Sequence, residues 1–265
     1  MQLVGTTALV TGAGQGIGYA IASRLMLDGA NVAALELDAA LAEPLAAALE
    51  EQAGNGTRAL AVTGDVTSAA DVERAFTEAE AAFGPVTMLV NNAGVAKLVL
   101  LVDLSEEDWD RTIAVCLKGT FLCLRRFARR AIDGGTGGAV VNIGSLNGMR
   151  GSDGLSHYSA AKAGIQQLTE VAASELGRHG IRVNTIAPGV IETPLTKTTF
   201  LGPRMREEYL AHTPLGRIGE VGDIASVAAF LLSEEARWIT GATIPVDGGN
   251  HVRGLHSFWD TLHPE

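Results

Sequence analysis

The segment that decides the fold is "ALVTGAGQGIG" (8–18), in which an apolar run leads into a glycine-rich turn and then a predicted helix. Gly12, Gly16 and Gly18 permit a tight turn, close backbone approach and tight packing of helix on strand. The helix then offers free N–H groups and a positive dipole to a pyrophosphate. A plain tight turn is the alternative, but the flanking strand and helix and the position early in the chain favour a dinucleotide site.

Outward from this segment, short apolar runs alternate with longer amphipathic stretches. Nearly continuous apolar strands, each followed by a helix, indicate a parallel sheet covered on both faces. With right-handed crossovers, this pattern predicts a single-domain α/β fold, a Rossmann-like doubly wound sheet of about seven strands. The predicted strands are 7–12, 31–36, 58–65, 86–94, 138–144, 181–189 and 242–249, and the predicted helices are 17–27, 39–52, 69–82, 106–132, 158–179 and 221–232.

Composition excludes several classes of partner. The 265 residues suit one domain, and a formal net charge of −10 leaves no cationic face for nucleic acid or anionic lipid. No basic signal-peptide region and no run as long as a membrane span is found. Cys116 and Cys123 are predicted to lie too far apart along one helix to form a disulfide. We therefore expect a reduced, cytoplasmic protein with no nucleic-acid or membrane partner and no bound metal.

Two segments interrupt the alternation. Residues 192–217 form a long connection with three prolines, and such a connection is typical of a lid or a binding loop. Residues 251–265 contain Phe258 and Trp259, more apolar surface than a tail normally exposes. We predict a dinucleotide-binding and catalytic domain over 1–250. The aromatic tail packs either on this domain or, as we favour, at a subunit interface.

Glu36 ends the second predicted strand, 18 residues after Gly18. A carboxylate there can accept hydrogen bonds from the hydroxyls of an adenosine ribose, and it repels a 2′-phosphate. Position 15 is Gln15 rather than a basic residue, and Leu37 follows Glu36, so no cation is left to bind a phosphate. The alternative is that Asp38 is the important carboxylate and Glu36 is solvated. We favour Glu36, and therefore NAD over NADP.

Further motifs follow in order: "GDV" (64–66), "NNAG" (91–94), "IGS" (143–145), "YSAAK" (158–162) and "PGVIET" (188–193). Together with "TGAGQGIG" (11–18), they make the sequence resemble a short-chain dehydrogenase/reductase, of the branch whose chains are about this long. The resemblance extends from residue 6 to about 250. It implies a Rossmann-like fold, which agrees with the alternation of strands and helices.

The resemblance implies a catalytic set of Ser145, Tyr158 and Lys162. Tyr158 and Lys162 lie one helical turn apart and share a face. The resemblance makes Tyr158 the general acid/base and Lys162 its helper, which also holds the nicotinamide ribose. To act as a base near neutrality, the phenol must have its pKa lowered from about 10 to about 7, which corresponds to about 4 kcal/mol. One ammonium about 4 Å away supplies about that much. Ser145 ends the fifth predicted strand and can donate to the substrate oxygen, with Asn147 as a competitor and second substrate contact.

The remaining motifs are interpreted as cofactor contacts. The resemblance assigns the adenine to "GDV" and the floor of the adenosine site to "NNAG", where a purely structural amide pair is an equal alternative. It assigns the carboxamide and pyrophosphate to "PGVIET", for which a simple Pro-Gly turn is the alternative. The predicted cofactor residues are Gly12, Gln15, Gly16, Ile17, Gly18, Glu36, Asp65, Val66, Asn91, Asn92, Tyr158, Lys162, Pro188, Gly189, Ile191 and Thr193.

One position departs from the family pattern. The family usually has asparagine where "AVCLKGTF" (114–121) has Cys116. That asparagine is thought to anchor a water that links the lysine to bulk solvent as a proton relay. A thiol is a weak hydrogen-bonding group. We expect either that a neighbouring group or backbone carbonyl holds the water here, or that proton exchange is slower.

These observations predict an NAD-dependent oxidoreductase that interconverts a secondary alcohol and its ketone. The expected substrate is medium-sized and largely apolar, and the resemblance implies a homotetramer. A 3-oxoacyl-(acyl-carrier-protein) reductase is the nearest alternative; Glu36 argues against it, because biosynthetic reduction normally draws on NADPH. A catalytically idle NAD-binding redox sensor is an alternative of another class. The intact set of Ser145, Tyr158 and Lys162 argues against a sensor.

Overall fold

Seven parallel strands form one sheet in the computed structural model, which describes residues 3–199 and 202–253. The strands are β1 (Thr7–Thr11), β2 (Asn31–Glu36), β3 (Ala59–Thr63), β4 (Met88–Asn91), β5 (Gly138–Ile143), β6 (Ile181–Pro188) and β7 (Thr243–Val246). Their order in the sheet is β3-β2-β1-β4-β5-β6-β7. The predicted doubly wound fold is confirmed. The order reverses between β1 and β4, where sheets of this type bind their ligands.

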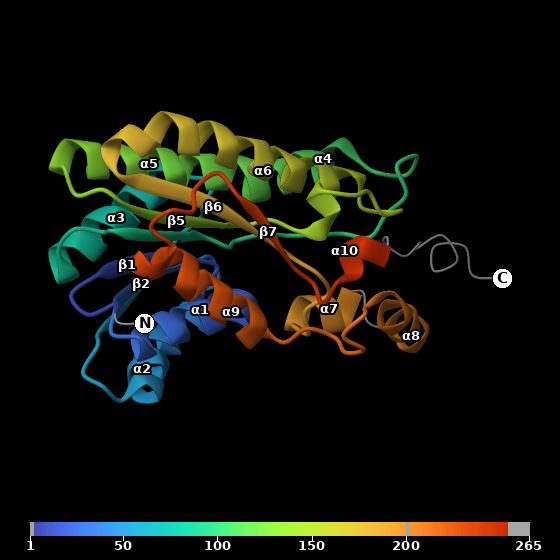
Figure 1. The fold of residues 1–265 in the computed structure, drawn as a ribbon, viewed down its shortest axis with the longest axis horizontal. Helices are drawn as coiled ribbons and strands as arrows, with labels where there is room; N and C mark the ends of the chain where they lie inside the picture. Colours follow the sequence, from blue (N-terminus) through green and yellow to red (C-terminus); the bar gives the residue numbers. More distant parts are fainter. Residues whose placement is uncertain (1–2, 200–201, 254–265) are drawn as a thin grey trace.

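Helices cover both faces of the sheet (Figure 1). One face carries α1 (Gly16–Leu27), α2 (Ala39–Ala53) and α9 (Val221–Leu232); the other carries α3 (Ala69–Phe83), α4 (Glu106–Thr112), α5 (Gly119–Gly134) and α6 (Ser156–Leu176). Because side chains alternate along a strand, each face has its own apolar core. In β1, Ala8 and Val10 belong to the core under α1 and α9, whereas Leu9 belongs to the core under α3, α5 and α6.

The helix predicted over 106–132 changes its winding in the middle. Between α4 and α5, residues Ile113–Lys118 form a π-helical turn. Turns of this kind are frequent at functional sites. Cys116 lies in this turn and is fully buried.

The segment 192–217 is more regular than the plain connection predicted. It contains α7 (Pro194–Thr199) and α8 (Pro203–His212), each of which begins at a proline. A proline at the first helical position is favourable, because its missing N–H would have had no partner within the helix. The prolines thus start helices rather than break them. Met205 and Tyr209 of α8 are buried in an apolar cluster with Leu155 and Ile218, and Tyr158 packs against this cluster.

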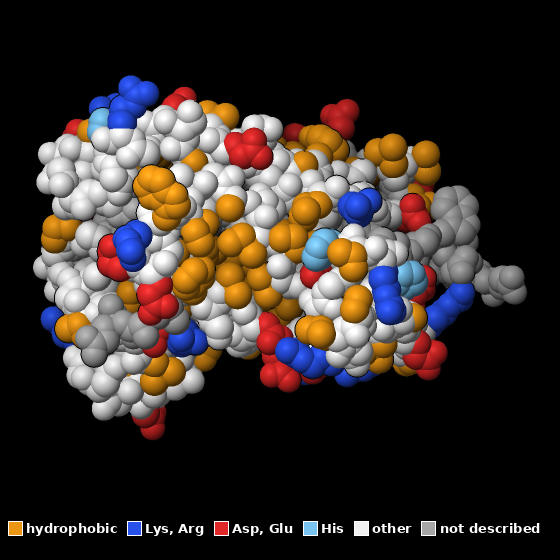
Figure 2. Space-filling model, in the orientation of Figure 1, with side chains coloured by type: hydrophobic (Ala, Val, Ile, Leu, Met, Phe, Trp, Pro, Cys, Tyr) orange, Lys and Arg blue, Asp and Glu red, His pale blue; other side chains and the backbone are white. Residues whose placement is uncertain are grey.

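The last strand, β7, forms an edge of the sheet, and its four residues are all partly exposed. Apolar side chains gather over this part of the surface (Figure 2). The predicted homotetramer is not tested by this surface and stays a prediction. The short helix α10 (Asn250–Arg253) follows, and the rest of the predicted aromatic tail lies outside the described residues. No helix in the described ranges is both long and apolar enough to cross a membrane.

Candidate active site

A cavity of about 670 Å³ opens at the carboxyl ends of the central strands. Its wall contains the glycine-rich turn after β1, Glu36 at the end of β2, and the segments that follow β3 to β6. The structure thereby brings together all the predicted site residues except Gly18, Asn91 and Asn147. Residues as far apart in the sequence as Gly12 and Thr196 therefore line one site.

The glycine-rich turn fits a pyrophosphate. Gly12 and Gly16 have φ of 63° and 60°, which favours glycine. Gly18 faces the strand instead: a Cβ there would lie 2.2 Å from the carbonyl oxygen of Gly12. Gln15 caps α1 without a side-chain hydrogen bond among the described residues, so the first N–H groups of the helix stay available to an anion.

The carboxylate of Glu36 is buried and held by three backbone groups. Oε2 accepts from the N–H of Gly14 at 2.8 Å, and Oε1 accepts from Leu37 and Asp38 at 2.9 and 3.2 Å. A Cβ on Gly14 would lie 2.8 Å from Oε2, so only glycine allows this approach. Oε1 is saturated, whereas Oε2 keeps one acceptor site. Asp38, the alternative carboxylate, instead caps α2 through Ala40 and does not line the cavity.

The three predicted catalytic residues lie at one end of the cavity. Tyr158 is in the first turn of α6, and Lys162 follows one turn later. The Lys162 ammonium is 5.5 Å from the centroid of the Tyr158 ring and donates to the carbonyl oxygen of Ile143 at 2.6 Å. Lys162 is almost completely buried, so its charge acts on the phenol with little screening by water.

Asn147 supports Ser145 rather than competing with it. The N–H of Asn147 donates to Oγ of Ser145 at 3.1 Å, within the short turn Leu146–Gly148. Ser145 lines the cavity, and Asn147 does not. The serine hydroxyl therefore accepts from the backbone of Asn147 and donates to Oδ1 of the same residue at 3.5 Å, a long hydrogen bond.

The two asparagines of "NNAG" have different surroundings: Asn92 lies beside the cavity, and Asn91 lies inside the protein. Nδ2 of Asn92 donates to the carbonyl oxygens of Thr11 and Gly12, at 3.0 and 2.9 Å, so it holds the glycine-rich turn beside the cavity. Nδ2 of Asn91 donates to Asn142 inside the protein, at 2.8 Å. Asn92 thus shapes the site, whereas Asn91 braces the sheet.

Several wall residues were not found from the sequence. Arg111 and Val115 come from the α4 end of the long helix region, and Leu195 and Thr196 come from α7. Arg111 and Val115 lie one turn apart on the face that Cys116 adjoins, so helical spacing from Cys116 is a signal that could have found them. The two residues of α7 lie in the segment 192–217, which the sequence predicts as a lid or binding loop, but the individual positions were not placed because the helix was not predicted.

Comparison with known proteins identifies the family. A family model described as enoyl-(acyl carrier protein) reductase matches residues 12–251. A (3R)-3-hydroxyacyl-CoA dehydrogenase from Mus musculus is 43% identical over 255 residues, which cover 94% of this chain and 97% of that protein. The structure of a short-chain type dehydrogenase/reductase from Mycobacterium ulcerans matches with a TM-score of 0.96 and 33% identity, over 100% of this chain and 96% of that one. The chain belongs to the short-chain dehydrogenase/reductase family.

Membership makes the chain an oxidoreductase that uses a nicotinamide cofactor. A second solved structure of similar fold is a putative 2-deoxy-d-gluconate 3-dehydrogenase from Agrobacterium tumefaciens with bound NADP. It has a TM-score of 0.87 and 37% identity, over 95% of this chain and 98% of that one. The cradle formed by Gly12 and Gly16 fits such a dinucleotide.

Cys116 holds the loop beside Lys162. Its thiol donates to the carbonyl oxygen of Val95 at 3.4 Å and accepts from the N–H of Val95 at 3.5 Å. Gly94 separates it from Lys162: a Cβ on Gly94 would lie 3.6 Å from Sγ and 3.8 Å from Nζ. These two bonds are those a side-chain amide could also make, since it has both a donor and an acceptor.

We therefore expect Cys116→Asn to speed proton exchange without displacing the loop. The amide can keep both bonds to Val95 and also hold a water near Lys162. The expected result is a rise in kcat of less than about tenfold, with a smaller solvent deuterium isotope effect. Steady-state kinetics in H2O and D2O measure both quantities. Cys116→Ser is the matched control and is expected to stay near the parent enzyme; an isotope effect unchanged in Cys116→Asn would contradict the relay explanation.

His157, next to Tyr158, is completely buried, and neither ring nitrogen has a hydrogen-bond partner in the described part of the chain. Burial lowers the pKa of His157; Asp108 opposes this shift and Lys97 adds to it. The native ring is therefore neutral near pH 7. In the unfolded chain it gains a proton below about pH 6.5.

This difference predicts that acid destabilises the native protein through His157. Between the lowered native pKa and about pH 6.5, the unfolded state binds more protons, so stability falls as the pH falls. We expect His157→Gln to lose less stability than the parent between about pH 7.5 and pH 5.5. Urea unfolding at the two pH values measures the loss. His179→Gln, at an exposed histidine, is the control and should behave like the parent; equal losses in all three proteins would contradict the prediction.

Proposed function

We propose that the protein is an NAD-dependent oxidoreductase that interconverts a secondary alcohol and its ketone, with Tyr158 as the general acid/base. The observation that carries the proposal is the joint geometry of one cavity. Ser145, Tyr158 and Lys162 meet at one end, and the glycine-rich turn and Glu36 form the other. A dinucleotide spanning this cavity would present its reactive ring to the catalytic residues.

Each residue has a chemical role in this proposal. The bound dinucleotide accepts or returns a hydride. In the oxidative direction Tyr158 takes the hydroxyl proton of the alcohol, and in the reductive direction it returns it. The Lys162 ammonium stabilises the phenolate form of Tyr158, and the Ser145 hydroxyl donates to the substrate oxygen.

The preference for NAD rests on Glu36. Its free acceptor site on Oε2 suits one hydroxyl of the adenosine ribose, whereas its charge opposes a 2′-phosphate at the same place. We assign the adenine to Asp65 and Val66, and the nicotinamide end to Lys162 and the 188–193 segment, all of which contribute to the cavity wall. The homotetramer and the cytoplasmic location remain parts of the proposal.

The ring of Tyr158 has apolar neighbours on one side. The Tyr158 ring packs in the cluster of Leu155, Met205, Tyr209 and Ile218, which supports a largely apolar substrate. A second candidate within the same chemistry is a 3-hydroxyacyl thioester. The 43% identical relative, a (3R)-3-hydroxyacyl-CoA dehydrogenase, favours it. An acyl chain is also apolar, so the cluster is compatible with both.

The test is formation of NADH, compared with NADPH, on a panel of substrates. The panel includes aliphatic, cyclic, aromatic and steroid-sized secondary alcohols and both enantiomers of 3-hydroxybutyryl-CoA. We expect turnover with NAD⁺ and much less with NADP⁺. Turnover of one 3-hydroxybutyryl-CoA enantiomer, with little activity on simple alcohols, would select the thioester. Tight NADH binding without turnover on any compound would contradict the enzyme proposal and support a redox sensor.

A further inference from the structure

We infer that Thr169 is a positioning residue for the catalytic pair, acting through a buried row of polar side chains beneath α6. This row consists of Asn91, Asn142, Thr169 and Thr185, which come from β4, β5, α6 and β6. All four are at most 4% exposed. The inference rests on the proposed function, since it concerns how Tyr158 and Lys162 are held.

Hydrogen bonds connect all four side chains of this row. Nδ2 of Asn91 donates to Oδ1 of Asn142 at 2.8 Å, and Nδ2 of Asn142 donates to Oγ1 of Thr169 at 2.8 Å. Oγ1 of Thr169 is 2.7 Å from Oγ1 of Thr185 and donates to the carbonyl oxygen of Ile165 at 2.9 Å. Three neighbouring strands are thereby tied to one point on α6.

The hydroxyl of Thr169 is fully used in this arrangement. It has one proton, which goes to Ile165, so the proton between the two threonines belongs to Thr185. Thr169 then accepts from both Asn142 and Thr185, which fills its two acceptor sites. Buried polar groups of this kind are costly when a partner is removed, so they favour one relative placement of helix and sheet.

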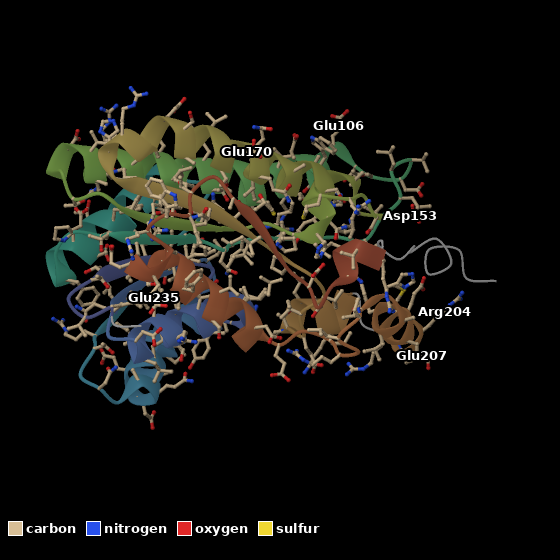
Figure 3. The ribbon with its side chains drawn as sticks, viewed as in Figure 1. Glu106, Asp153, Glu170, Arg204, Glu207 and Glu235 are labelled. Carbon is tan, nitrogen blue, oxygen red and sulfur yellow. The ribbon has the colours of Figure 1, made fainter. Side chains whose placement is uncertain are left out.

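The apolar contacts of α6 around Thr169 involve mainly small side chains. Besides Thr169, and His157 and Lys162 in its first two turns, the buried residues of α6 are Ala161, Ile165, Ala172 and Ala173, and the partly buried Leu168 and Leu176 pack against the same core. Small residues let the helix approach the sheet closely but resist its rotation poorly. Glu170, the next residue, is on the outer face of α6 (Figure 3). The polar row therefore adds a directional constraint on the rotation of α6 to these apolar contacts.

Rotation of α6 matters because the catalytic side chains extend far from the helix axis. Lys162 lies seven residues before Thr169, so two turns of one rigid helix connect them. A rotation of about 10° moves a tyrosine hydroxyl by more than about 1 Å, and a displacement of that size can cost about 100-fold in rate. It also changes the distance between the Tyr158 phenol and the Lys162 ammonium, and with it the electrostatic interaction between them.

The test replaces Thr169 by valine, which keeps the shape and removes the hydroxyl. We expect Thr169→Val to lower kcat at pH 7 by at least about tenfold and to raise the midpoint of the kcat–pH profile in the oxidative direction, so that part of the activity returns at higher pH. Thr169→Ser keeps the hydroxyl and is expected to restore both. Thr185→Val, which removes one donor, should shift the midpoint in the same direction by less, and it carries the test if Thr169→Val does not fold.

The control is Thr7→Val. Thr7 is another buried threonine and begins β1, at the end of the strand away from the cavity; its hydroxyl donates to the carbonyl oxygen of Phe83. It should lose thermal stability without moving the pH midpoint. Threonine variants that lose stability but keep the parent's midpoint and kcat would overturn the inference. Tyr158→Phe in the same series separates the two proposals: if it stays fully active, the proposed function fails, whatever Thr169→Val shows.

Discussion

Replacing Tyr158 by phenylalanine is expected to lower kcat for alcohol oxidation about 1000-fold, within the range for loss of a general acid/base. This corresponds to about 4 kcal/mol in the activation barrier. The phenyl ring can keep its place in the apolar cluster with Leu155 and Tyr209, so the fold should be unchanged. Only the hydroxyl that exchanges the proton is lost. The affinity for the dinucleotide, measured by fluorescence titration with NADH, should change little, since the glycine-rich turn and Glu36 remain.

Tyr19→Phe is the matched control. Tyr19 is on α1, and its hydroxyl donates to Gln52 at the surface, at 2.9 Å. Tyr19→Phe thus removes a phenolic hydroxyl as well, but from a residue that does not line the cavity, and activity should stay at the parent level. If Tyr158→Phe kept more than about a tenth of the parent kcat, another group would have to exchange the proton.

The architecture could be predicted from the sequence because its signals are local. Each strand is a short apolar run bounded by glycine or a polar residue, as in "TALVT" (7–11), and each long helix has its apolar residues on one side. The glycine-rich turn and the spacing of Tyr158 and Lys162 are local as well. Most residues of these local motifs line the cavity, whereas their binding roles stay predictions.

The features that sequence did not reveal depend on distant contacts. The π-helical turn at Ile113–Lys118 differs from an α-helix by one residue, which the apolar periodicity does not resolve. Pro194 and Pro203 suggested an irregular connection but start helices. The bond between Asn142 and Thr169 joins residues 27 positions apart, and neither residue type signals its partner. The choice between Glu36 and Asp38 likewise needed the three-dimensional arrangement of backbone N–H groups.

Glu36→Ala is expected to reverse much of the preference for NAD. We expect the ratio of kcat/KM with NAD⁺ to kcat/KM with NADP⁺ to fall by at least about 100-fold, or roughly 3 kcal/mol. Part of the fall is lower kcat/KM with NAD⁺, because the ribose loses its acceptor on Oε2. The other part is higher kcat/KM with NADP⁺, because the negative charge is gone. The three N–H groups of Gly14, Leu37 and Asp38 then lose their carboxylate and converge on an empty place that suits an anion.

Asp38→Ala separates this local effect from a general change in charge. It removes the same charge two residues away, but Asp38 is exposed and caps α2 through the N–H of Ala40 at 2.9 Å. Loss of that cap should cost about 1 kcal/mol of stability and leave the cofactor ratio unchanged. A parent enzyme that already used NADP⁺ as well as NAD⁺ would contradict the assignment. Equal effects of Glu36→Ala and Asp38→Ala on the ratio would mean that overall charge, and not the buried carboxylate of Glu36, selects the cofactor.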